Sequence, residues 1–248
     1  MPSNFREGLD QKYFSTQYKH FMPTTPEGWA CVLDRIRLNF EDVLSPLSRD
    51  SLILDVACGV GYLEHYLLSQ GFQSLESIDI SGEQIAIAKQ KLTEYGVDFD
   101  GRVKFVEASA FDYLGKSDAY DVVVMFDIIE HFAKEKIGQL LGLSYTALRP
   151  GGLLLLRTIN ADNPLFGRSF YHDFTHETPF TPDSIRQCMA AVGFRINKLD
   201  YEKVGRSERT LMGWLKGKTR SGGLRALAKL LGIPHAAFAE NLIVVARK

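Results

Sequence analysis

The stretch ILDVACGVGYLEHYLLSQG, residues 53–71, decides the fold class. It joins a short apolar run, typical of a buried strand, to a segment with the apolar spacing of a helix. Gly59 and Gly61 lie in the turn between the two. Glycine permits positive φ and lets a ligand approach the backbone closely, so this turn is a candidate binding loop.

The same alternation of strand and helix patterns continues on both sides of this turn. Strands are predicted at residues 51–56, 74–80, 102–106, 121–126 and 153–158, and helices at 26–44, 62–69, 82–95, 133–148 and 182–192. Such alternation predicts an α/β fold with a parallel sheet and helices on both faces. Ligands of such sheets bind beyond the carboxyl ends of the strands, so the residues that follow each strand form one expected functional edge.

Composition excludes several protein classes. The chain has 248 residues, 45% of them hydrophobic, and a net charge of −1, so no global charge favours nucleic acid or membrane. Its three scattered cysteines form neither a disulfide framework nor a zinc pattern, and they suit a reducing compartment. No run approaches the roughly 18 apolar residues of a membrane span, and the first residues lack the apolar core of a secretory signal. We therefore expect a cytoplasmic protein.

Acidic residues around the glycine turn indicate the kind of ligand. Glu64 stands where a dinucleotide fingerprint has its third glycine, and a glutamate there would repel a pyrophosphate. Asp55 precedes the turn, and Asp79 ends the second predicted strand, 18 residues past Gly61. A carboxylate at that second position suits the hydroxyls of a ribose. These features disfavour NAD and FAD, and Asp55 would either cap the loop or face a cationic ligand.

With these residues the chain resembles the class I S-adenosylmethionine-dependent methyltransferases. The matching stretches are LDVACGVG, SIDIS, VEASAFDY, YDVVVMFDIIEH and LRPGGLLLLRTIN, in that order within residues 50–160. The resemblance implies a doubly wound, Rossmann-like, mostly parallel seven-stranded sheet whose last strand is antiparallel. Residues 195–201 and 241–247 would be its final two strands, with a helical insertion between them.

The resemblance also implies S-adenosyl-L-methionine as the cofactor. The cofactor-binding residues would be Asp55, Ala57, Gly59, Gly61, Asp79, Ile80, Ser109, Ala110 and Phe126. Among them, Asp79 would hold the ribose hydroxyls, Ile80 would pack on the adenine, and Phe126 would lie beside the sulfonium. Ser109 and Ala110 match the positions at the adenine edge.

Two polar clusters follow the fourth and fifth predicted strands, DIIEH at 127–131 and YHDFTH at 171–176. Removing a proton from an acceptor hydroxyl requires a base or a metal ion. We predict His131 or His176 as the base, because a neutral imidazole near pH 7 suits that role. We predict that the acceptor contacts Tyr171, His172 and Asp173.

A divalent metal is the alternative to a metal-free base. The pattern resembles ubiquinone-pathway O-methyltransferases and small-RNA 3′-terminal ribose methyltransferases, which implies a metal set of Asp127, Glu130, His131 and His176. Asp127 departs from the glutamate of those families, which shortens its reach. A Glu-His pair after this strand is also common in relatives without any metal.

The last two predicted strands are separated by a basic segment. Residues 203–229 contain eight lysines and arginines against one glutamate, a net charge of +7, and two amphipathic helices are expected within 206–240. We interpret the segment as a solvated helical flap over the acceptor cleft. The alternative interpretation is that the basic segment contacts a phosphorylated or lipid-linked acceptor, or an anionic membrane surface. Nucleic acid is disfavoured, because no aromatic stacking platform accompanies the charge.

We expect one methyltransferase domain over residues 1–248. Its parts would be an N-terminal helical lid (1–48, with Tyr13, Phe14 and Tyr18 as lid aromatics), a cofactor-binding core (49–160), an acceptor loop, helix and strand (161–205), the basic insertion (206–240) and a final strand (241–248).

The acceptor class follows from a further resemblance. Residues 160–185 and 191–194 look like a subgroup of bacterial methyltransferases that often accompany polysaccharide and secondary-metabolite assembly. This favours O-methylation of a sugar-like, glycan or other small hydroxylated acceptor. The alternatives are RNA ribose 2′-O-methylation and a non-catalytic regulator that binds S-adenosylmethionine.

Overall fold

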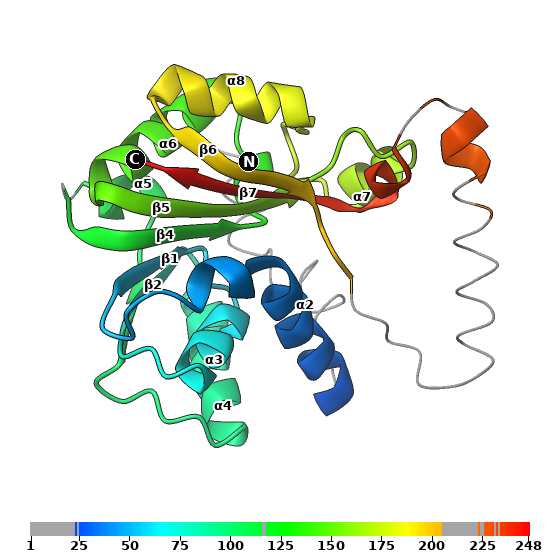
Figure 1. The fold of residues 1–248 in the computed structure, drawn as a ribbon. Helices are drawn as coiled ribbons and strands as arrows, with labels where there is room; N and C mark the ends of the chain where they lie inside the picture. Colours follow the sequence, from blue (N-terminus) through cyan, green and yellow to red (C-terminus); the bar gives the residue numbers. More distant parts are fainter. Residues whose placement is uncertain are drawn as a thin grey trace, which may run out of the picture.

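The computed structural model describes residues 23, 25–115, 118–204, 223, 226–230, 232 and 234–248. Within them, one seven-stranded sheet is covered by helices on both faces (Figure 1). The expected lid aromatics Tyr13, Phe14 and Tyr18 and most of the basic insertion lie outside the described residues. Among the described helices, none combines the length and the apolar character needed to cross a membrane.

The strand order confirms the predicted sheet. The strands are β1 (Leu52–Val56), β2 (Ser74–Asp79), β3 (Val103–Glu107), β4 (Tyr120–Phe126), β5 (Leu148–Ile159), β6 (Arg195–Tyr201) and β7 (Asn241–Arg247). They lie in the order β3-β2-β1-β4-β5-β7-β6, and β7 is antiparallel to both of its neighbours. The central strands β1 and β4 are buried along most of their length, as their mostly apolar sequences predict.

Two hydrophobic cores form, one on each face of the sheet. Helices α2 (Pro26–Leu44), α3 (Tyr62–Ser69) and α4 (Gly82–Glu94) pack against one face. The other face is covered by α5 (Ala110–Tyr113), α6 (Lys134–Ala147) and α8 (Pro182–Val192). Figure 1 shows these two helical layers below and above the sheet. Short helical turns lie at α7 (Phe166–Tyr171), η2 (Ile129–His131) and η3 (His235–Phe238).

Local capping explains where the main helices begin. The Thr25 hydroxyl accepts a hydrogen bond from the Gly28 N–H at 3.1 Å, and Pro26 takes the first helical position of α2. Thr181 and Ser184 form a reciprocal capping box at the start of α8. Both starts agree with the prediction from sequence.

The structure differs from the prediction in three elements. Strand β5 begins at Leu148, so the Pro-Gly-Gly segment at 150–152 lies inside the strand. It forms an irregularity there, because Leu148 pairs with Tyr120 whereas Leu153 pairs with Val122. Helices α5 and α7 were not predicted, since four and six residues carry too little periodicity to be recognised.

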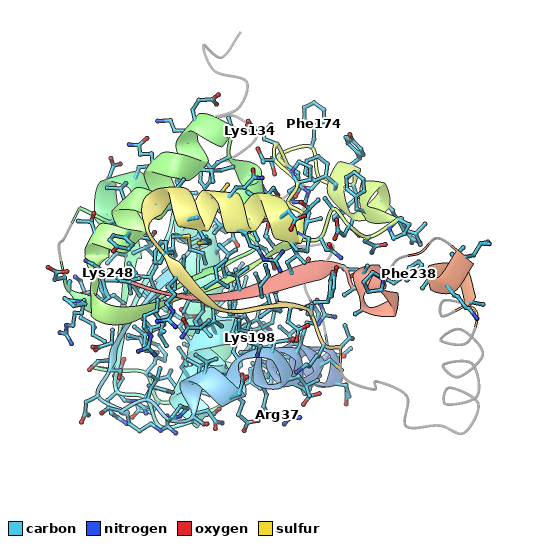
Figure 2. The ribbon with its side chains drawn as sticks, turned by 45° about the horizontal axis from the view of Figure 1, so that its top comes forward. Arg37, Lys134, Phe174, Lys198, Phe238 and Lys248 are labelled. Carbon is cyan, nitrogen blue, oxygen red and sulfur yellow. The ribbon has the colours of Figure 1, made fainter. Side chains whose placement is uncertain are left out.

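Helix α2 is tied to the sheet by polar contacts at β6. The buried Asn39 side chain donates to the Lys203 carbonyl at 2.8 Å and accepts from the Lys203 N–H at 2.7 Å. The Lys198 ammonium on β6 donates to Asp42 on α2 at 2.9 Å, and Figure 2 shows Lys198 beside this helix. The described part of the expected lid is therefore a packed element of the domain.

Candidate active site

A cavity of about 740 Å³ opens at the carboxyl ends of β1, β2, β4 and β5. Such a volume is typical of small-molecule sites. The residues that follow each of these strands line it, as the strand alternation predicted. Eight of the expected cofactor-binding residues are among them: Asp55, Ala57, Gly59, Asp79, Ile80, Ser109, Ala110 and Phe126.

The glycine-rich turn is fastened to the end of β2 by Asp79. One Asp79 carboxylate oxygen accepts from the Gly59 N–H at 2.9 Å and the other from the Ser81 N–H at 2.8 Å. Burial raises the pKa of the Asp79 carboxyl, and these two backbone donors oppose the shift. Asp79 thus fixes both loops at one side of the cavity.

Gly61 is absent from the cavity lining, and its local geometry gives it a packing role. It is the N-cap of α3, with φ of 86°. A Cβ at this position would lie 2.9 Å from the Ala88 Cβ on α4. Gly61 therefore permits the close approach of two helices and supports the binding loop indirectly.

The expected adenine side presents an exposed apolar surface. Ile80 is 63% exposed although it borders the cavity, so its side chain is available to pack against a flat apolar group. The Ser109 hydroxyl accepts from the Phe111 N–H at 3.2 Å and caps α5. The short helix α5 therefore begins directly at this edge of the cavity.

Asp127 is placed differently from the expected metal set. Its carboxylate accepts two hydrogen bonds from the Arg157 guanidinium on β5, one of them at 2.8 Å from Nε. Arg157 also lies over the Phe126 ring, with 5.3 Å from its Cζ to the ring centroid. Asp127 and Arg157 thus form an ion pair at the wall of the cavity, and Asp127 does not join the metal-competent group described below.

One side chain, that of Thr175, connects His131 to the buried carboxylate of Asp173. The Thr175 hydroxyl donates to Asp173 Oδ1 at 2.6 Å, and the Thr175 N–H donates to the same oxygen at 2.8 Å. His131 Nδ1 lies 2.8 Å from the Thr175 oxygen. Because the hydroxyl proton is directed at Asp173, the Thr175 oxygen accepts from Nδ1–H. This arrangement puts the His131 proton on Nδ1 and the lone pair on Nε2.

His176 lies beside His131, with 4.6 Å between the ring centroids. Its Nδ1 donates to the Phe170 carbonyl at 2.8 Å, which again assigns the lone pair to Nε2. Burial lowers the pKa of His176, so this imidazole is neutral near pH 7. The structure therefore brings the two histidines predicted as bases together in one cavity wall.

The three residues predicted to contact the acceptor differ in their position relative to the cavity. His172 lines the cavity, whereas Asp173 lines it with a carboxylate already engaged by Thr175. Tyr171 does not line the cavity and is 77% exposed, which differs from its expected role. Phe174 is 79% exposed and projects outward (Figure 2), so Tyr171 and Phe174 are the two residues of this segment outside the cavity lining.

A family model described as a methyltransferase domain matches residues 20–199. This match covers the glycine-rich turn, the cavity strands and both histidines. The chain belongs to the methyltransferase domain family.

Relatives of this methyltransferase domain support the same family. A ubiquinone biosynthesis O-methyltransferase of Xylella fastidiosa (strain 9a5c) is 28% identical over 158 residues, which span 63% of the chain and 61% of that relative. One from Azotobacter vinelandii is 32% identical over 108 residues, 44% of each chain. The matches to these curated relatives thus span less than two thirds of their length.

Solved structures share the fold of this methyltransferase domain. A SAM-dependent methyltransferase from Archaeoglobus fulgidus aligns with a TM-score of 0.67 at 18% identity, covering 95% of this chain and 99% of its own. Magnesium protoporphyrin IX methyltransferase (ChlM) from Synechocystis PCC 6803 with bound SAM aligns with a TM-score of 0.63 at 15% identity, covering 100% and 99%.

Three of the four residues predicted as metal ligands lie close enough together in this methyltransferase domain to bind one metal ion. One ligand atom each from Glu130, His131 and His176 lies within 4.8 Å of the others. Two imidazoles and a carboxylate are chemically suited to a divalent transition metal. Glu130 is buried and accepts from the Thr158 hydroxyl at 2.9 Å, and burial together with the nearby Asp127 charge raises its pKa to about 8. The donor set fits a divalent cation.

Sequence reasoning missed Thr175 and Arg157. Thr175 lies within the polar segment that was recognised, yet nothing in the sequence connects it to His131, 44 residues away. Arg157 is a lone charge in the apolar run LLLLRTI, and this signal could have marked it as a residue with a buried role.

Proposed function

We propose that this chain is an S-adenosylmethionine-dependent O-methyltransferase that acts on a small hydroxylated acceptor, with sugar-like and glycan acceptors as the class to test first. One observation carries the proposal: a single cavity joins the glycine-rich, acidic cofactor loops to the His131–His176 wall. Its volume is adequate for a nucleoside and a small second substrate together.

The residues of the cofactor side fit a cationic nucleoside. Asp55 and Asp79 are buried carboxylates at the cavity wall, which complement positive charge and would repel a pyrophosphate. Ile80 offers the apolar surface on which an adenine would pack. When bound, the cofactor supplies an electrophilic methyl group on a sulfonium sulfur.

His131 is the base that the hydrogen bonds favour. Its Nε2 would accept the proton of the acceptor hydroxyl. The resulting imidazolium is stabilised through Thr175 by the Asp173 carboxylate. His176 Nε2 lies 3.9 Å from Asp173 Oδ2, and burial lowers the pKa of His176, so we assign to it the role of orienting the acceptor.

The alternative to a metal-free base is a divalent cation held by Glu130, His131 and His176. Such an ion would act as a Lewis acid on the acceptor oxygen. Activity that survives prolonged treatment with a chelator favours His131 alone, whereas activity lost to the chelator and restored by a divalent cation favours the metal.

Several features support a polar acceptor that is methylated on a hydroxyl oxygen. The relatives from Xylella fastidiosa and Azotobacter vinelandii are O-methyltransferases of ubiquinone biosynthesis. On the acceptor side, Arg168, Ser169 and His172 add polar groups to the cavity lining. The basic segment at 203–229, with a net charge of +7, supports a phosphorylated or lipid-linked acceptor, and peripheral contact with an anionic membrane is part of this proposal.

The test is methyl transfer from S-[methyl-³H]adenosylmethionine to an acceptor panel of free sugars, sugar phosphates, nucleotide sugars and quinol precursors. We expect one methyl group on a hydroxyl of a sugar-like acceptor. His131→Ala should lower turnover by roughly 10²- to 10⁴-fold and leave cofactor affinity within about twofold. Methylation of quinol precursors alone would overturn the sugar-like class, and cofactor binding without transfer to any acceptor would favour the regulator.

A further inference from the structure

Arg157 places a positive charge in the wall of a cavity that we assign to a cationic cofactor. It stands in the apolar run LLLLRTI of β5, its side chain is largely buried, and it lines the cavity. Its guanidinium lies over the ring of Phe126, which lines the same cavity, with 5.3 Å from Cζ to the ring centroid. A guanidinium in this position would repel a sulfonium unless nearby carboxylates cancel its charge.

The sheet register places Arg157 near the glycine-rich turn. Arg157 pairs with Phe126 on β4, and the preceding residue of β4, Met125, pairs with Val56 at the end of β1. Neighbouring strands lie about 4.8 Å apart, so the backbone of Arg157 is roughly 10 Å from the start of the turn. Burial and neighbouring acids raise the pKa of Asp55, and the charge of Arg157 opposes that shift. The cation therefore acts on the cofactor side of the cavity.

Asp127 supplies a carboxylate that compensates this charge at the cavity wall. It accepts two hydrogen bonds from the guanidinium, one of them at 2.8 Å from Nε, and its N–H donates to the Arg157 carbonyl at 3.0 Å. The Asp127 backbone lies in the left-handed region, with φ of 53°. Aspartate and asparagine adopt this region more often than most other residues that carry a side chain. Side-chain and backbone bonds thus fix the Asp127 carboxylate on Arg157.

A second carboxylate, that of Glu202, compensates Arg157 only in part. Glu202 is buried, and its Oε1 lies 3.6 Å from Arg157 Nη1. The same oxygen lies 3.9 Å from Nε of Arg35 on α2, so Glu202 is shared by two cations. Glu202 does not line the cavity, whereas Asp127 does. Of these two carboxylates, Asp127 is therefore the one that a cavity ligand faces.

We propose that Asp127 determines the preference of the cofactor site for a cation, because its carboxylate cancels the charge of Arg157 and so prevents repulsion of the sulfonium of S-adenosylmethionine. This inference rests on the proposed cofactor site. The sulfonium is positive, whereas S-adenosylhomocysteine, which remains after methyl transfer, is a neutral thioether at that atom. Loss of the Asp127 charge should therefore weaken binding of S-adenosylmethionine and spare binding of S-adenosylhomocysteine. For one unit charge at about 10 Å we expect an effect of roughly 3- to 10-fold.

The experiment is titration calorimetry of the full chain with S-adenosylmethionine and, separately, with S-adenosylhomocysteine. We expect Asp127→Asn to raise the Kd of S-adenosylmethionine roughly 3- to 10-fold and to leave the Kd of S-adenosylhomocysteine within about twofold. Asparagine has the same shape, still accepts a hydrogen bond from the guanidinium and tolerates the positive φ, so the variant removes little except the charge. Asp127→Gly, which also permits this φ, is the second variant if Asp127→Asn does not fold, and it is judged by the same ratio of Kd values.

Asp121→Asn provides the matched control. Asp121 lies on β4 and, like Asp127, pairs with an arginine of β5, since its carboxylate accepts from Arg149 at 2.8 Å, but it does not line the cavity. This variant should keep the wild-type ratio of the two Kd values. An unchanged ratio in Asp127→Asn, including an equal loss of affinity for both ligands, would overturn the inference and leave the cofactor assignment intact. A wild-type chain that binds neither ligand would overturn both.

Discussion

The chemistry of the cavity depends on where individual protons lie. The Thr175 oxygen accepts a hydrogen bond from His131 Nδ1–H and its hydroxyl donates to Asp173, so one threonine selects the histidine tautomer. Glu130, one residue before His131, is buried and favours its neutral form. At the scale of the residue, hydrogen bonding and burial set both protonation states.

Removing the Thr175 hydroxyl should therefore weaken the base. We expect Thr175→Val to lower turnover roughly 10- to 100-fold, because His131 loses its tautomer control and its imidazolium loses stabilisation. The pH–rate profile should shift, while cofactor affinity measured by calorimetry stays unchanged. Thr178→Val is the control, since Thr178 is equally buried nearby but donates to the Phe132 carbonyl. Equal losses in both variants would show that Thr175 is only structural.

Glu130 should make stability depend on pH. The folded protein keeps a proton on Glu130 up to about pH 8, whereas the unfolded chain releases it near 4.5. Between these values the native state binds more protons, so stability falls as pH rises, by on the order of 1.4 kcal/mol per pH unit for one proton. Urea unfolding across this window should show a shallower slope for Glu130→Gln. The exposed Glu135→Gln should keep the wild-type slope.

At the scale of the element, the binding loop is supported by the contact between α3 and α4. Gly61 begins α3 in the left-handed region, and its missing side chain leaves room for Ala88 on α4. The loop that precedes Gly61 carries the Gly59 N–H group, which donates to Asp79. The shape of the cavity wall therefore depends on how closely two helices approach.

A methyl group at Gly61 should disturb this approach. We expect Gly61→Ala to lower the free energy of unfolding by about 2–4 kcal/mol, from the positive φ and from overpacking against Ala88, and to weaken cofactor binding. Gly96→Ala separates the two causes, because Gly96 has φ of 67° and a Cβ there would meet nothing within 4 Å. It should cost only about 1 kcal/mol and leave binding unchanged. Similar losses at both sites in chemical denaturation would contradict the packing argument.

At the scale of the whole molecule, contacts distant in sequence join the start of the domain to its last strands. Asn39 on α2 bonds both backbone groups of Lys203, 164 residues away. Lys198 on β6 reaches the Asn39 carbonyl and Asp42 on the same helix. Helix α2, which contributes Ile36 to the cavity lining, is thereby fixed against the sheet.

Breaking the buried contact should cost more than breaking the exposed one. We expect Asn39→Ala to lower the free energy of unfolding by about 2–3 kcal/mol, because the backbone of Lys203 loses its partners. Asp42→Ala removes an ion pair whose carboxylate is 63% exposed and should cost at most about 1 kcal/mol. Thermal or urea unfolding measures the stability of both variants. An equal loss of stability would show that burial does not decide the strength of the contacts between α2 and the last strands.

The sequence by itself determined the order and type of the main elements, the cofactor edge of the sheet and the family resemblance. Strands β1 and β4 are mostly apolar runs, α2 and α8 begin at Thr-Pro caps, and the glycine turn lies between β1 and α3. These signals are local, because hydrophobic periodicity and capping act over a few neighbouring residues.

Only the tertiary structure decided which polar side chains act together. It paired Asp127 with Arg157, turned Tyr171 away from the cavity, placed Gly61 against Ala88, and joined Thr175 to His131. Hydrogen bonds and burial between residues far apart along the chain depend on how the strands and helices pack, and no local pattern records that packing.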